Sequence, residues 1–141
     1  MKKQLQDYVH KRFNPLNGEW ILVCPHRTQR PWLGQNEKIQ LEAKKSYEKD
    51  CYLCPSNQRK NGAKNPNYTS TYVFDNDFAS LQKETPSFTF KEGLLNAKAE
   101  TGQCKVICYS PDHAKSMAEM SVTEIIKVIQ VWKKEYIQLG K

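Results

Sequence analysis

The sequence has no long apolar run. In the 141 residues of the chain, no apolar segment approaches the roughly 18 to 20 residues needed to span a bilayer. The polar N-terminus lacks the apolar core of a signal peptide. Internal repeats and low-complexity tracts are also absent. These absences exclude an integral membrane protein and a repeat architecture, and they predict a folded protein in the cytoplasm.

Charge of one sign is in modest excess, because 22 lysines and arginines face 15 acidic residues, for a net charge of +7. Such an excess favours anionic partners. Much of it is scattered lysine with acids between, so a mildly basic surface is preferred over a nucleic-acid-binding one. The length and the 15 aromatic residues suit one domain with a real core, or part of a larger protein.

The five cysteines are an odd number in a chain without a secretory signal, which favours metal binding or burial over disulfides. Cys51 and Cys54 form a C-x2-C turn, whose two thiolates can reach one tetrahedral metal ion. No second C-x2-C is present, so a redox dithiol or two buried cysteines remain alternatives. His113 follows a strand and a proline turn and could close the site, or it could be an ordinary histidine. Cys104 and Cys108 are better explained by core burial.

The hydrophobic pattern predicts an α+β fold, with a mostly antiparallel sheet built from strands near residues 19–24, 70–75 and 104–109. A capping box, Ser121 to Glu124, precedes apolar residues at helical spacing. We therefore expect a C-terminal amphipathic helix that packs on the sheet, with Trp132 in the core.

Two arginines, Arg27 and Arg30, lie in a segment bracketed by Pro25 and Pro31, which disfavour a helix. We expect an extended loop at a strand end, where both guanidinium groups could bind phosphate oxygens or form ordinary salt bridges. Asn76 and Asp77, at another strand end, are candidates for binding or for a structural turn.

Three long segments occur in a distinctive order: "RFNPLNGEWILVCPHRTQRPW", "CYLCPSNQRKNGAKNPNYTSTYVFDNDF" and "CKVICYSPDH". From about Arg12 to the helix after Ser121, the chain resembles the N-terminal half of the galactose-1-phosphate uridylyltransferase family, in the histidine-triad-like superfamily. The resemblance implies a histidine-triad-like half-barrel and a nucleotidyltransferase of galactose metabolism. Such an enzyme exchanges uridylyl groups between UDP-glucose or UDP-galactose and hexose 1-phosphates through a uridylyl-histidine, as a homodimer with shared active sites.

The resemblance also implies roles for individual residues. Cys51, Cys54 and His113 match zinc ligands. Arg27, Thr28, Gln29 and Arg30 match a loop that reaches the UDP-hexose of the neighbouring subunit. Asn76 and Asp77 match residues that hold the nucleotide, and Tyr52, Phe74 and Val106 match positions that wall the uracil. Lys60 matches a position near the partner subunit's nucleotide, where the family tends to have an apolar residue.

The chain departs from the family in its histidines. The family's nucleophile lies in a His-Pro-His motif, whereas His10, His26 and His113 form no His-x-His arrangement. We therefore expect residues 1–141 to be an N-terminal part that stops before that motif, contains no catalytic residue and is inactive alone.

Three alternatives remain open from the sequence. The same scaffold could carry adenylyl transfer to or from a sugar phosphate. The C-x2-C turn could belong to a zinc-knuckle module for single-stranded nucleic acid. A chain of this length could also fold only partly, with a sheet edge and a sheet face left uncovered.

Overall fold

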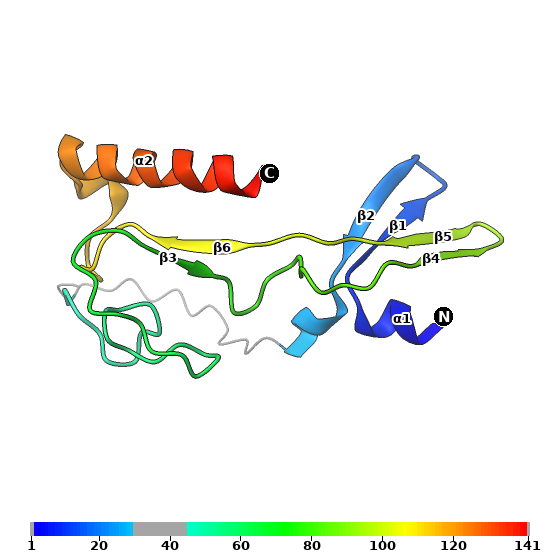
Figure 1. The fold of residues 1–141 in the computed structure, drawn as a ribbon, viewed down its shortest axis with the longest axis horizontal. Coiled ribbons are helices and arrows are strands. Elements are labelled where there is room, and N and C mark those ends of the chain that lie inside the picture. The colour runs from blue at the N-terminus through cyan, green and yellow to red at the C-terminus, as the bar shows by residue number, and fades with distance from the viewer. Residues whose placement is uncertain (1, 30–44, 141) are drawn as a thin grey trace. The chain divides into compact units, whose positions relative to one another are not determined.

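The computed structural model describes residues 2–29 and 45–140 (Figure 1). These residues fall into two compact units. The first unit holds residues 2–29 and 78–105, and the second holds residues 45–77 and 106–140. The chain therefore crosses from the first unit to the second and back before it ends in the second.

The first unit is built around a four-stranded sheet of order β2-β1-β5-β4, in which each neighbouring pair is antiparallel. Its elements are α1 (Lys2–Asp7), β1 (His10–Asn14), β2 (Glu19–Val23), β4 (Thr89–Glu92) and β5 (Leu95–Ala99). Two hairpins supply the strands, visible in Figure 1 as a blue pair and a yellow-green pair. Their turns contain Gly18 at φ +75° and Gly93 at φ +58°, a region that glycine enters without the steric penalty of a Cβ.

The core of this unit is small. Val9 and His10 are fully buried, and Phe90 and Ala97 are buried on the hairpin of β4 and β5. The edge strand β2 keeps Trp20, Ile21 and Leu22 at least 40% exposed. The sheet thus has one buried centre and an apolar edge.

The proline-bracketed segment is a short 3-10 helix, η1 (Pro25–Gln29), so the prediction of an extended loop was wrong. Proline is tolerated in the first turn of a helix, because the N–H that it lacks would have no partner there. Pro25 occupies that first position. The proline argument excluded a helix through the segment but not a helix that starts at the proline.

The second unit contains β3 (Tyr72–Asp75) paired with β6 (Lys105–Cys108), then η2 (Met117–Glu119) and α2 (Val122–Leu139). The α+β class, the three expected strands and the C-terminal helix are confirmed. Their assembly into one sheet was wrong, because β2 lies in the four-stranded sheet whereas β3 and β6 form a separate pair. The strands β1 and β5, which were not expected over those residues, and β4 complete the larger sheet.

Helix α2 begins where the capping box predicted. Ser121 Oγ accepts a hydrogen bond from the Glu124 amide at 3.3 Å, and Glu124 Oε2 accepts one from the Ser121 amide at 2.8 Å. Lys115 Nζ adds an ion pair to Glu124 Oε1 at 2.8 Å. Val128 is fully buried, but Trp132, expected in the core, is 48% exposed. The apolar stripe is therefore only partly covered by the described residues.

In the part of the chain that the structure describes, neither α-helix combines the length and the apolar character needed to cross a bilayer.

The Glu124 carboxylate should make the stability of α2 depend on pH. The ion-paired hydrogen bond from Lys115, followed by the hydrogen bonds from Ser121, lowers the pKa of Glu124 from 4.5 to about 2. A pKa lowered by folding contributes stability above the unfolded pKa, and this contribution disappears as pH falls through the folded pKa. Glu124→Gln should therefore lower the melting temperature at neutral pH, and the difference from the unsubstituted chain should fade between pH 4.5 and about 2.

Glu92→Gln, at the exposed end of β4, is the matched control and should show no such pH-dependent difference. A Glu124→Gln difference that persists unchanged at pH 2 would contradict the role of the charge.

Candidate functional site

The Cys51–Cys54 segment is a turn whose backbone carbonyls are hydrogen-bonded by two asparagine side chains. The Cys54 amide donates to the Cys51 carbonyl at 3.2 Å, which makes the turn tight. Asn57 Nδ2 lies within hydrogen-bond distance of the carbonyls of Cys51, at 2.7 Å, and Glu48, at 2.9 Å. The buried Asn65 donates to the carbonyl of Cys54 at 3.0 Å. These amides satisfy carbonyl groups that the turn would otherwise leave unpaired.

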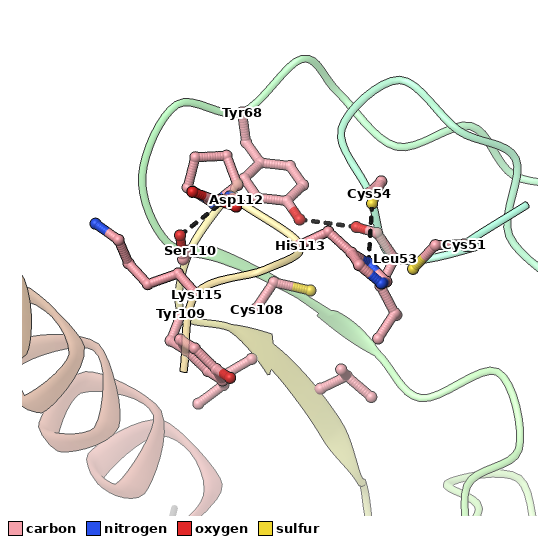
Figure 2. Close-up of a pocket in the computed structure, with 13 residues that line it drawn as sticks. Cys51, Leu53, Cys54, Tyr68, Cys108, Tyr109, Ser110, Asp112, His113 and Lys115 are labelled. Atoms are coloured by element: carbon pink, nitrogen blue, oxygen red, sulfur yellow. Dashed lines mark hydrogen bonds between the residues drawn. The ribbon is translucent and has the colours of Figure 1, made fainter. Parts of the chain in front are cut away.

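A second turn presents His113. The Asp112 amide donates to Ser110 Oγ at 3.0 Å, and Asp112 Oδ1 accepts from the Ala114 amide at 2.9 Å (Figure 2). The His113 amide donates to the Ser46 carbonyl at 2.8 Å, which ties the turn to the segment before the C-x2-C motif. Short polar side chains that bind nearby backbone stabilise turns of this kind.

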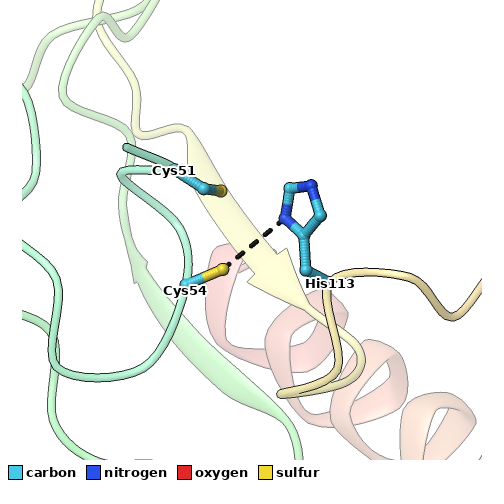
Figure 3. A group of neighbouring side chains, drawn as sticks. All are labelled: Cys51, Cys54 and His113. Carbon is cyan, nitrogen blue, oxygen red and sulfur yellow. Dashed lines mark hydrogen bonds between the residues drawn. The ribbon is translucent and has the colours of Figure 1, made fainter. Parts of the chain in front are cut away.

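The two turns bring Cys51, Cys54 and His113 together (Figure 3). One ligand atom from each lies within 4.8 Å of the others, and Cys54 Sγ is 3.5 Å from His113 Nδ1. Tetrahedral zinc with sulfur and nitrogen ligands places such atoms about 3.5 to 3.8 Å apart. Burial raises the pKa of the Cys54 thiol, so a cation would have to displace a firmly held proton. The donor set fits a metal ion after a small contraction.

A cavity of about 200 Å³ opens beside this metal-ligand group (Figure 2). Its wall includes Tyr68, Val106 and Cys108 in addition to the three ligands. Burial raises the pKa of Tyr68, so its phenol keeps its proton and donates to the Leu53 carbonyl at 2.7 Å. Val106 is the one expected uracil-contacting residue that lies in this wall.

The end of β3 carries a second group of the predicted residues. The Arg59 guanidinium lies over the Phe74 ring, 4.3 Å from its centroid. Arg59 Nη1 is 3.5 Å from Asp77 Oδ1. Lys60 Nζ lies 5.6 Å from the centroid of the half-exposed Tyr52 ring. Phe74 and Asp77 are thus brought together through an arginine that the sequence argument did not select.

Asn76 lies between these two, directly after β3, and is partly exposed. Four residues that shape the site escaped the sequence argument: Asn57, Arg59, Asn65 and Tyr68. Cys108 is buried, as expected. The two asparagines lie in a turn-rich part of the sequence. Such a sequence predicts a loop, but it does not predict which backbone carbonyls the asparagine side chains will bind. Nothing in the spacing of Arg59 distinguishes it from the lysines and arginines around it.

The predicted phosphate-binding segment lies in the first unit. Arg27 Nη1 donates to Ser80 Oγ at 2.6 Å, and Thr28 Oγ1 donates to the Pro25 carbonyl at 2.9 Å. Gln29 is exposed at the end of η1. Arg30 lies outside the described residues.

Each of the three histidines makes a contact through at least one ring nitrogen. His10 is fully buried, with Nδ1 at 2.8 Å from the Tyr8 carbonyl and Nε2 accepting from Arg12 Nε at 2.9 Å. His26 Nε2 donates to the Ala79 carbonyl at 2.6 Å, and its Nδ1 is buried. In the metal-ligand group, His113 Nδ1 faces Cys54 Sγ at 3.5 Å.

A family model described as "Galactose-1-phosphate uridyl transferase, N-terminal domain" matches residues 1–141. The chain belongs to this family. A galactose-1-phosphate uridylyltransferase of Haemophilus influenzae is 45% identical over 135 residues, which are 95% of this chain and 39% of that protein. The enzyme of Kluyveromyces lactis is 41% identical over 149 residues, covering 100% of this chain and 40% of that protein.

The chain therefore spans about two fifths of the length of these uridylyltransferases. A solved structure described as "Structure of uridylyltransferase" aligns with a TM-score of 0.63 at 19% identity, over 92% of this chain and 34% of the other. At that identity the alignment supports the fold, which agrees with the α+β arrangement described above.

The metal-ligand group should bind one divalent ion per chain. Titration with cobalt(II) should produce thiolate-to-metal absorption, and Cys54→Ser should weaken cobalt binding at least about tenfold, because a lost ligand costs more than a lost outer-shell partner. Cys104→Ser, outside the group, is the control and should bind as the unsubstituted chain does. Equal binding by both variants would show that the group is not the metal site.

Proposed function

We propose that this chain is the nucleotide-binding and metal-binding part of a UDP-glucose:hexose-1-phosphate uridylyltransferase, a cytoplasmic enzyme of galactose metabolism. The observation that carries the proposal is the family match over residues 1–141, joined with the meeting of Cys51, Cys54 and His113. The relatives named above are uridylyltransferases. This supports the uridylyl reaction over an adenylyl one and over a module for single-stranded nucleic acid.

The nucleotide would be held at the end of β3. Phe74 would wall the uracil, with Tyr52 and Val106 on neighbouring segments, and Asn76 and Asp77 offer polar groups for the ribose. Lys60, beside Tyr52, would add positive charge near the partner subunit's nucleotide.

The metal-ligand group would hold zinc, which suits two thiolates and an imidazole. Zinc bound there would fasten the Cys51–Cys54 turn to the His113 turn and so contribute folding energy, as structural zinc sites do. The chain's own asparagines, Asn57 and Asn65, orient the cysteine turn from outside the ligand set.

The arginine segment would serve the neighbouring subunit of a homodimer. Arg27 is bonded to Ser80, and His26 is bonded to Ala79, so η1 is already fixed to the segment at residues 79–80. A guanidinium group that is ordered before binding loses less conformational entropy when it binds a diphosphate. Arg30 would be the second cation of this clamp.

The nucleophile would come from outside these 141 residues. In the proposed double displacement, a histidine nitrogen attacks the α-phosphorus of UDP-glucose, and the bond to the β-phosphate oxygen breaks as glucose 1-phosphate leaves. Galactose 1-phosphate then takes the uridylyl group from the histidine. Because His10, His26 and His113 form no His-x-His arrangement, the chain alone would bind the nucleotide without turning it over.

Calorimetry should show that the chain binds UDP-glucose more tightly than ADP-glucose, and Phe74→Ala should weaken UDP-glucose binding about tenfold. Mass spectrometry after incubation with UDP-glucose should find no uridylyl adduct. Phe13→Ala, in β1 of the first unit, is the control and should bind normally. Preference for ADP-glucose would replace the uridylyl assignment, and an adduct on His26 would overturn the assignment of the nucleophile.

A further inference from the structure

Arg59 is held in place by a tight turn of its own. Its amide donates to the Ala63 carbonyl at 2.7 Å, and its carbonyl accepts from the Gly62 amide at 3.0 Å. Gly62 has φ +89°, which a residue with a Cβ rarely adopts. The turn points the long side chain inward, since only 13% of it is exposed.

The guanidinium lies over the last ring of a row of three aromatic side chains in the second unit. It lies 4.3 Å from the Phe74 centroid, and Phe74 stacks on Tyr72 at 5.5 Å, which stacks on Tyr68 at 5.1 Å. A cation over an aromatic ring is attracted by the ring quadrupole, and Arg stacks in this way more readily than Lys. Arg59 therefore restrains one face of Phe74.

The same guanidinium neutralises Asp77, whose side chain is 8% exposed. The distance of 3.5 Å between Nη1 and Oδ1 is an ion pair rather than a hydrogen bond, and among the described residues both atoms lack a hydrogen-bond partner. A buried carboxylate without a cation is strongly destabilised. Among the described residues, the ion pair with Arg59 is the contact recorded for Asp77 Oδ1, so this contact couples the carboxylate to the stacked guanidinium.

We propose that Arg59 is a positioning residue of the nucleotide site: it stacks on Phe74, pairs with Asp77, and so fixes the distance between the base-contacting ring and the ribose-contacting carboxylate. The inference rests on the proposed function, in which Phe74 and Asp77 hold UDP. Its consequence is specificity for ribose. A carboxylate held at a fixed distance from the base raises the affinity for a nucleotide whose sugar carries a hydroxyl at that position. A mobile carboxylate does not raise it in this way.

The test compares UDP with 2′,3′-dideoxyuridine diphosphate by calorimetry, for the unsubstituted chain and for Arg59→Lys and Arg59→Gln. The unsubstituted chain should prefer UDP by about tenfold or more, as expected for a lost hydrogen bond to a charged group. Both variants should lower UDP affinity about tenfold and change affinity for the dideoxy analogue much less, so that the preference shrinks. A solely structural role would lower both affinities equally.

Arg12→Gln is the control, because it removes a guanidinium that donates to His10 in the first unit. It should leave both affinities unchanged. Cobalt(II) absorption at the metal-ligand group reports whether each Arg59 variant is folded. If Arg59→Gln is not folded, the ratio of UDP affinity to dideoxy-analogue affinity in Arg59→Lys decides.

A folded Arg59→Lys chain that keeps its UDP affinity and its preference, or loses affinity for both ligands equally, overturns this inference alone. An unsubstituted chain that binds metal but not UDP overturns the proposed function together with it.

Discussion

Two turns separated by 59 residues meet where the Cys54 thiol approaches the His113 imidazole, and the described part of the second unit depends on that meeting. Each turn is shaped by its own hydrogen bonds from short polar side chains, so the ligands are presented before any metal arrives. The pairing of β3 with β6 carries the second turn to the first. The cavity lies beside the contact and takes its wall from both turns.

One loop serves both halves of the candidate site. Asn57 and Asn65, near its two ends, bind carbonyls of the cysteine turn, and Arg59 between them reaches Phe74 and Asp77 at the end of β3. A displacement of this loop would therefore disturb the metal ligands and the proposed nucleotide contacts together. A turn-rich segment with little regular structure therefore holds residues of both groups in position.

The local features were predictable because they rest on interactions between residues close in sequence. The capping box at Ser121 set the start of α2, and β-branched or aromatic runs marked β2, β3 and β6. The strands β1 and β5 were missed because their sequences, "HKRFN" and "LNAKA", contain no β-branched residue and only one aromatic residue. Their stability comes from pairing with distant strands, which no local pattern records.

By itself the sequence determined the family, the strand and helix signals of these short runs, and three candidate metal-ligand residues, Cys51, Cys54 and His113. Only the tertiary structure decided which charges pair and which histidines are engaged. Arg59 looks like its exposed neighbours in the sequence, and it differs because folding places it between a ring and a carboxylate. Burial and pairing depend on segments that approach from far along the chain, so Trp132 could follow a core pattern and still lie half exposed.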